Sequence, residues 1–326
     1  MRLLRRTLAS LAFAVPVLAA AVPVAADTDI TWGTSAVGSS GHKALVNLAN
    51  VLNKEFKGYQ VTVQAMPGAI VSVKSYASGK TLGYYGADIA FYELANGTNR
   101  FKGFKEQMKR QPVQSFWTFT VEVGVAINAR DKDTIKSWGD LTGKQFFSGP
   151  LPWDTRAHLE RGLAAVGAKH NYIEVDLATA GSLMESKRLD GFIIYTNAEA
   201  TTAPWITEAG LTTNWLALNP SKDEEAKLNK AGIALTEVKA EAFKRDIGMP
   251  SVKLLPFYYG FHVGMEIPEA DVYRMLTIVE KNVDELVSLD KAFAQLKDMA
   301  GMQRKGVESS IDLVPVHPGL AKWMKE

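Results

Sequence analysis

Two long β-rich segments, widely separated in the sequence, constrain the fold of this chain more than any other feature. Residues 115–128 contain the run FWTFTVEVGVAIN, and residues 253–264 contain LLPFYYGFHVG. Both are longer than the usual strand of about five to six residues. A strand of this length can leave one domain and enter another, so the pair predicts two lobes joined by two crossings, with a hinged cleft between them.

Strand and helix patterns alternate around these segments, which is typical of strand–helix units on a mostly parallel sheet. For example, before the first crossing a short strand pattern is followed in the sequence by apolar residues that recur with the spacing of one helical face. In chain order we expect a strand at 29–32, a helix at 45–56, a strand at 61–63, a helix at 70–77, a strand at 88–91, a strand at 145–148, helices at 155–166 and 178–187, a strand at 191–196, and helices at 272–279 and 293–297.

The expected class is therefore α/β with two lobes. The 300 residues that follow position 26 are more than one core usually fills, which also favours two domains. The crossings place the boundaries: we expect residues 27–121 and 255–326 to form lobe I, and residues 122–254 to form lobe II.

Residues 1–26 have the pattern of a secretory signal peptide. They contain three arginines near the start, an apolar stretch over 8–18 and Val24-Ala25-Ala26 directly before Asp27. A membrane anchor is the alternative, but Pro16 and Pro23 interrupt the apolar run, which is shorter than the ~20 residues that span a bilayer. We expect cleavage after Ala26 and export to the periplasm.

Charge and cysteine content exclude several functional classes. Residues 1–26 carry three arginines and no acid, so their removal lowers the net charge from +2 to −1. This balance argues against a nucleic-acid-binding protein. The sequence has no cysteine, which excludes disulfides, thiolate metal sites, cysteine nucleophiles and a lipid-modified cysteine.

Signatures of catalysis are also missing. Ser35 lies in GTSAV, which is not the G-x-S-x-G elbow, and the chain has no H-E-x-x-H, Walker or G-x-G-x-x-G motif. The five histidines are scattered, with none paired at metal-ligand spacing. We expect no metal, no cofactor and no enzymatic activity, although an enzyme on the same two-lobed scaffold remains an alternative.

Three loops lie where strands end and helices begin, at 34–41, 67–69 and 149–156. Ligands of open α/β sheets bind beyond the carboxyl ends of the strands, where the N–H groups of helix starts attract anions. The first loop, TSAVGSSG, offers hydroxyls and close backbone approach at two glycines. A helix cap formed by Ser40 is the alternative interpretation of this loop.

Arg156 in the third loop, GPLPWDTR, is a candidate ligand-binding residue. Asp154 or Thr155 resembles an N-cap, which puts Arg156 in the first turn of its helix, where a cation opposes the helix dipole by about 0.3–1 kcal/mol. A bound carboxylate held by the guanidinium would offset this cost. Pairing with Asp154 or Glu160 at the surface would also do so, and the sequence leaves both possibilities open.

Aromatic residues near the predicted sheet ends could form the wall of a cleft around the apolar part of a ligand. They are Tyr92, Trp117, Trp153 and Tyr195. A place in the core is the alternative for each of them. Tyr92 and Tyr195 are favoured as wall residues because they lie at predicted strand ends.

The chain after residue 26 resembles, over essentially its whole length, the TAXI class of extracytoplasmic solute-binding proteins. These serve tripartite ATP-independent periplasmic (TRAP) transporters. The resemblance rests on an ordered set of segments: ITWGTSAVGSSGHKALVNLANVLNK, GADIAFYELANG, DTIKSWGDLTGKQFFSGP, RLDGFIIYTNAEATTAPWI and the terminal VPVHPGLAKWMKE with its H-P-G pattern.

The resemblance implies a type II periplasmic binding protein-like fold, in which two α/β lobes close on a small organic acid, often glutamate or a related dicarboxylate. The expected partners are that acid and the membrane subunits of a TRAP transporter, with no nucleic acid, and we expect a monomer. A binding protein that serves a sensor or an ATP-driven importer is a further alternative.

Carried over by position, the family's ligand-binding residues predict a site in this chain. They are Ser35, Gly38, Ser39, Ser40, Gly68, Ala69, Tyr92, Thr155, Arg156, Tyr195 and Asn197. The chain departs from the family at Ser39-Ser40, where a tyrosine pair is frequent, in the second loop GAIVS, and at Pro152-Trp153. The resemblance therefore predicts an organic acid rather than glutamate in particular, and Trp153 is a candidate to narrow the site or to stack on a flat acid.

Overall fold

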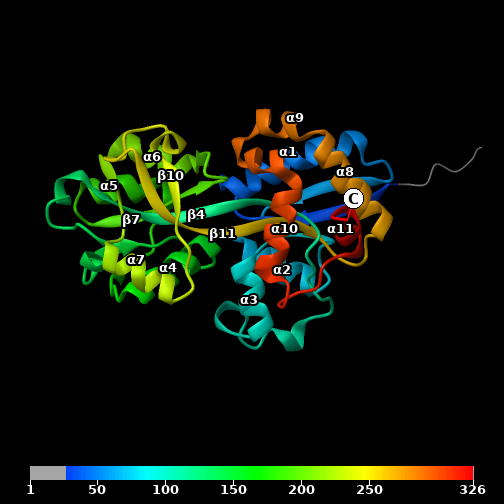
Figure 1. Cartoon of the computed structure of the whole chain (residues 1–326), viewed down its shortest axis with the longest axis horizontal. Coiled ribbons are helices and arrows are strands. Elements are labelled where there is room, and N and C mark those ends of the chain that lie inside the picture. Colours follow the sequence, from blue (N-terminus) through cyan, green and yellow to red (C-terminus); the bar gives the residue numbers. More distant parts are fainter. Residues whose placement is uncertain (1–26, 326) are drawn as a thin grey trace, which may run out of the picture.

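The computed structural model describes residues 27–325 and shows two lobes side by side, joined by two long strands (Figure 1). The predicted signal peptide lies outside the described residues. The strands are β1 (Thr28–Gly33), β2 (Tyr59–Gln64), β3 (Gly83–Ala87), β4 (Trp117–Asn128), β5 (Gln145–Phe147), β6 (Asn171–Tyr172), β7 (Gly191–Asn197), β8 (Thr201–Thr202), β9 (Trp215–Leu218), β10 (Thr236–Lys239) and β11 (Ser251–Val263).

Helices cover the sheet in both lobes. They are α1 (Ser40–Glu55), α2 (Ala69–Ala77), α3 (Asp88–Asn96), α4 (Asp154–Val166), α5 (Ala180–Glu185), α6 (Pro204–Thr212), α7 (Lys222–Lys230), α8 (Glu269–Lys281), α9 (Val283–Leu289), α10 (Met299–Ser310) and α11 (Pro318–Trp323). In Figure 1, α4 to α7 lie in one lobe, and α1 to α3 with α8 to α11 lie in the other. None of the helices within residues 27–325 has the length and apolarity needed to cross a membrane.

The strands form one mixed sheet in the order β2-β1-β3-β11-β4-β7-β5-β6. β1 pairs in parallel with β2 and β3, whereas β11 pairs antiparallel with both β3 and β4. β4 continues into the second lobe, where it pairs with β7 and β9, and β11 begins there beside β10. The α/β class and the two-lobed arrangement with two crossovers, predicted from the sequence, are confirmed.

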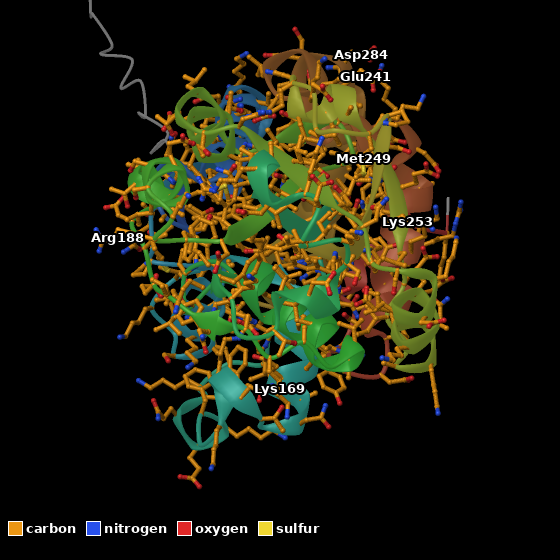
Figure 2. The ribbon with its side chains drawn as sticks, turned by 90° about the vertical axis from the view of Figure 1, so that its left-hand side faces the viewer. Lys169, Arg188, Glu241, Met249, Lys253 and Asp284 are labelled. Atoms are coloured by element: carbon orange, nitrogen blue, oxygen red, sulfur yellow. The ribbon has the colours of Figure 1, made fainter. Side chains whose placement is uncertain are left out.

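The crossing strands also supply much of the core. Every residue of β4 is buried, so both faces of this strand, including the polar side chains of Thr118, Thr120 and Glu122, pack inside the protein. On the outside of the second lobe, charged side chains such as Lys169, Arg188 and Glu241 project into solvent (Figure 2).

One predicted element is wrong. Residues 88–91, expected as a strand, begin α3, and the strand is the preceding glycine-containing segment, β3. The apolar run after Asp88 fits either structure, but an acid at this position favours a helix start, and its Oδ1 accepts from the N–H of Ile89 at 2.6 Å. Gly83 is required inside β3, because a Cβ there would lie 2.5 Å from the indole of Trp32.

Two further helices differ in detail from the prediction. The helix expected at 178–187 is a short 3₁₀ turn followed by α5, and residues 293–297 lie in a 3₁₀ helix, Lys291–Asp298. The short strands β6, β8, β9 and β10 have two to four residues each, too few for a recognisable alternation.

A buried carboxyl group lies where β4 passes between the lobes. Glu122 is fully buried and faces Thr196 of β7 and Pro256 of β11 in the sheet. It accepts hydrogen bonds from the hydroxyls of Thr120 and Thr196 and from the N–H of Glu199. Burial raises the pKa of Glu122 from 4.5 to about 8, and these hydrogen bonds offset part of the effect.

This carboxyl group should make the protein less stable as the pH rises. Because its pKa is higher in the folded protein, the folded state binds the proton more tightly, and stability is lost as pH rises from about 4.5 to about 8. The variant Glu122→Gln mimics the protonated form. Urea unfolding at pH 5 and pH 8 measures the free energy of unfolding of both proteins. Relative to the parent protein, the variant should gain up to about 1.4 kcal/mol of this free energy for each unit by which the pH rises.

Asp88 should leave a residual pH dependence in that variant, because burial raises its pKa to about 7. Glu106→Gln, at an exposed glutamate, serves as the matched control. If the free energies of unfolding of the parent protein and of Glu122→Gln changed with pH in the same way, this would contradict a raised pKa of Glu122.

Candidate functional site

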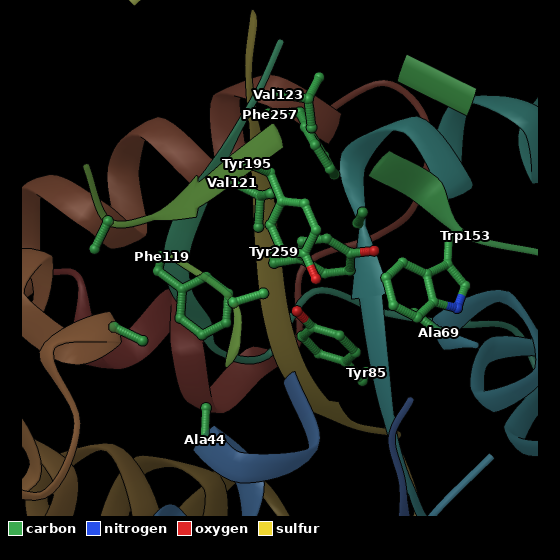
Figure 3. Close-up of a cluster of buried hydrophobic side chains, with 14 of the residues drawn as sticks. Ala44, Ala69, Tyr85, Phe119, Val121, Val123, Trp153, Tyr195, Phe257 and Tyr259 are labelled. Carbon is green, nitrogen blue, oxygen red and sulfur yellow. The ribbon is translucent and has the colours of Figure 1, made fainter. Parts of the chain in front are cut away.

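A cavity of about 40 Å³ lies between the two lobes. Figure 3 shows the side chains of Tyr85, Tyr195, Tyr259 and Trp153 pointing toward one another in this region. The volume holds a few atoms, well below the ~300–1,000 Å³ of common ligand pockets, so a larger ligand requires the lobes to separate. The lining residues are Ser35, Ser39, Ser40, Gly41, Ala69, Tyr85, Val121, Trp153, Thr155, Tyr195, Asn197 and Tyr259.

Three helices begin at this cavity: Ser40 and Gly41 start α1, Ala69 starts α2, and Thr155 lies in the first turn of α4. Neither α2 nor α4 has a side-chain cap. Among the described residues, no hydrogen-bond acceptor contacts the N–H groups of Ser40, Gly41, Ala69 or Thr155. Free N–H groups and three helix dipoles therefore converge on one small volume, which favours a bound anion.

The side chains that line the cavity are hydroxyl, phenol, amide and apolar groups. Ser35 and Ser39 share a 2.5 Å hydrogen bond, and Ser39 also caps α1 by accepting from the N–H of His42. Burial raises the pKa of Tyr195, and hydrogen bonds from Trp205 and Ser40 partly offset this effect. Tyr195 therefore presents a neutral hydroxyl group, which can donate a hydrogen bond to a ligand.

Two polar atoms of the lining residues are buried and have no hydrogen-bond partner within residues 27–325. They are Oγ1 of Thr155 and Oδ1 of Asn197, on side chains that are 6% and 1% exposed. A buried polar atom without a hydrogen bond is costly, and such atoms at a cavity mark a place for ligand groups.

A buried ion pair connects the lobes directly behind the cavity. Asp154, 0% exposed, accepts from Arg100 Nη1 through Oδ1 and from the Tyr259 hydroxyl through Oδ2, both at 2.6 Å. Arg100 also donates to Glu93 at 2.7 Å, and these carboxylates raise its pKa against the opposing effect of burial. A further bond across the lobes runs from Trp153 Nε1 to the carbonyl of Pro67 at 3.2 Å.

The structure brings together eight of the residues predicted for the site: Ser35, Ser39, Ser40, Ala69, Trp153, Thr155, Tyr195 and Asn197. Four others do not line the cavity. Gly38 lies in the first loop with a φ of 85°, and Gly68 is the N-cap of α2, packed on Pro152 and Trp153. Tyr92 is 54% exposed, because residues 88–96 form a helix rather than a strand.

Arg156 is the fourth. It lies in the first turn of α4 as predicted, but its guanidinium stacks 4.2 Å from the ring centre of Tyr172 and lies 3.6 Å from Glu160. The pairing with Glu160 is therefore the arrangement that the structure contains. Trp117, considered as a wall residue, is a core residue, and its indole N–H bonds Gln114.

Several residues that line the cavity or lie directly behind it have no recognisable signal in the sequence. Tyr85 and Tyr259 lie inside strands, where tyrosine usually packs in a core, and their rings stack 4.3 Å apart. Arg100 follows α3 in a polar segment that resembles an exposed loop. Asp154 is the first residue of α4 rather than its N-cap, which is Trp153.

Comparison with known proteins gives one family match and several remote structural likenesses. A family model described as "NMT1-like family" matches residues 32–326. None of the curated proteins matches the chain. The periplasmic aliphatic sulphonate binding protein SsuA from Escherichia coli is similar at 14% identity, over 92% of this chain and 79% of that chain, with a TM-score of 0.46.

The probable amino-acid ABC transporter extracellular-binding protein ytmK from Bacillus subtilis is similar at 13% identity, over 83% of this chain and 97% of that chain, with a TM-score of 0.45. The ligand-binding core of GluR0, solved with L-glutamate, is similar at 12% identity, over 81% of this chain and 97% of that chain, with a TM-score of 0.46.

Proposed function

The chain belongs to the NMT1-like family, and on the basis of this membership and of the cavity geometry we propose that it is an extracytoplasmic solute-binding protein that captures a small organic acid between its lobes. The convergence of three helix N-termini on an interlobe cavity carries the proposal. Within residues 27–325, no lysine or arginine lines this cavity, so the backbone N–H groups and the helix dipoles supply the positive potential for the carboxylate.

The proposed action is capture by closure. Residues 27–121 with 255–326, and residues 122–254, act as two lobes that hinge on β4 and β11. Binding brings the starts of α1 and α2 toward the start of α4, and the apposed loops at Pro67 and Trp153 complete the enclosure. A closed form that differs from the open form in shape provides the surface that a transporter can recognise.

We assign the partner and location on the sequence resemblance to the TAXI class. The protein acts as a monomer in the periplasm and delivers its ligand to the membrane subunits of a TRAP transporter. It is a carrier rather than an enzyme: the side chains around the cavity are hydroxyl, phenol, amide and apolar groups, and the adjoining carboxylate of Asp154 is held by Arg100 and Tyr259.

Calorimetric titration tests this proposal. The protein is first unfolded and refolded to remove any ligand that copurifies, and is then titrated with acetate, propionate, lactate, succinate, malate and glutamate. We expect saturable binding of at least one of these acids without turnover by mass spectrometry. The absence of binding to every acid, or conversion of one of them to a product, would contradict the proposal.

Arg156→Ala should retain the affinity of the parent protein within about twofold, because the guanidinium contacts Tyr172 and Glu160 instead of the cavity. Titration of the variant with the tightest acid measures the effect. Loss of binding would instead show that Arg156 contributes to the ligand site.

A further inference from the structure

The cavity offers a hydrogen-bond acceptor that a simple carboxylate cannot satisfy. Asn197 ends β7 and lines the cavity, and its Oδ1 is buried with no hydrogen-bond partner among the residues that the structure describes. A carboxylate only accepts hydrogen bonds, so it pairs with the N–H groups of the helix starts but leaves Oδ1 unsatisfied. A complementary ligand therefore carries a donor group in addition to its carboxylate.

The kind of donor follows from the charges around the cavity. An ammonium group would need a buried counter-charge, but no carboxylate from the described part of the chain lines the cavity. The adjoining Asp154 already accepts from Arg100 and from Tyr259 through its two oxygens. A hydroxyl group needs only hydrogen bonds, which Oδ1 of Asn197 and Oγ1 of Thr155 can supply.

Size and polarity restrict the rest of the molecule. The volume is about 40 Å³, and Ala69 and Val121 contribute apolar surface. A short hydrocarbon part fits such surroundings, whereas a second carboxylate would need further donors. Building on the function proposed above, we propose that the ligand is a short-chain hydroxymonocarboxylate whose carboxylate faces the helix N-termini and whose hydroxyl group donates to Asn197.

Matched pairs of acids test this inference. Refolded protein is titrated with propionate and lactate, and with butyrate, 2-hydroxybutyrate, 3-hydroxybutyrate and 2-aminobutyrate. We expect a hydroxy acid to bind about tenfold or more tightly than its parent acid and its amino analogue, because only the hydroxyl group pairs with Asn197 without burying a charge.

The variant Asn197→Leu, which is similar in size but lacks the acceptor, should bind the hydroxy acid and its parent acid with equal affinity. The melting temperature of the variant shows whether it folds. If it does not fold, the pairwise titration of the parent protein still tests the preference for the hydroxy acid. Equal affinities within each pair, or preference for the amino acid, overturn the hydroxy-acid inference while leaving an organic-acid carrier. Failure of every acid to bind overturns the proposed function itself.

Discussion

Replacing Arg100 by methionine should weaken ligand binding by roughly a hundredfold and leave the lobes apart in solution. Asp154 is fully buried, and its Oδ1 accepts from Arg100 across the lobes. Removing one partner of a buried ion pair costs about 3–5 kcal/mol, because the other charge remains desolvated. Opening of the lobes returns Asp154 to water, so the cost falls on the closed form that binds the ligand.

Two readouts separate closure from general stability. Calorimetry measures the affinity, and small-angle X-ray scattering measures the radius of gyration with and without ligand. Arg100 also pairs with Glu93, which lies in the same proposed lobe, so the variant should also lose some stability in its open form. Adding Glu93→Gln should recover melting temperature but little affinity, whereas adding Asp154→Asn should recover closure.

Arg110→Met provides the matched control, because Arg110 pairs with Glu266 inside one proposed lobe. This variant should bind as the parent protein does. An Arg100→Met variant with the affinity and the ligand-induced compaction of the parent protein would show that the interlobe ion pair does not govern closure.

Introducing valine at Gly68 should abolish measurable binding by obstructing closure. A Cβ at this position would lie 3.2 Å from the carbonyl oxygen of Pro152 and 3.4 Å from Cδ1 of Trp153, both across the cleft. The additional methyl groups of valine have no room there while the lobes are closed. The φ of −175° suits any residue, so the backbone itself is not strained.

Calorimetry and scattering measure this effect as well. Gly68→Ala is the control. Alanine and valine are both weak N-cap residues, so each should lower helix stability by about 1 kcal/mol at most. Alanine, however, adds only the first methyl group. We expect it to bind with intermediate affinity, and both variants to melt within a few degrees of the parent protein. Tight binding by Gly68→Val would show that the loops at Pro67 and Pro152 do not meet in the bound state.

The architecture could be predicted from the sequence because long elements carry strong patterns. The crossing strands β4 and β11 are β-rich runs of 12 and 13 residues, and α1 has a clear 3.6-residue periodicity. The loops that follow β1 and β5 are also predicted by these patterns, and Ser35, Ser39 and Thr155 of the predicted loops line the cavity. Loops that connect parallel strands to helices reach one edge of the sheet, so their position follows from chain order alone.

Tertiary pairing explains what could not be predicted. The first-turn position of Arg156 in α4 follows from the sequence. Its stacking on Tyr172 does not, because the sequence pattern does not show that this later segment lies beside α4. Arg100 and Asp154 likewise meet only because two lobes are apposed. The boundary between β3 and α3 could not be predicted, because a short apolar run fits both the strand periodicity and the helix periodicity.

A crystal structure of the protein with the acid that binds most tightly would show whether the helix N-termini hold the carboxylate. We predict a closed form in which carboxylate oxygens lie about 3 Å from backbone N–H groups at the starts of α1, α2 or α4, between Tyr195 and Tyr259. A ligand bound outside this cavity, or a cationic group placed against these N–H groups, would contradict it.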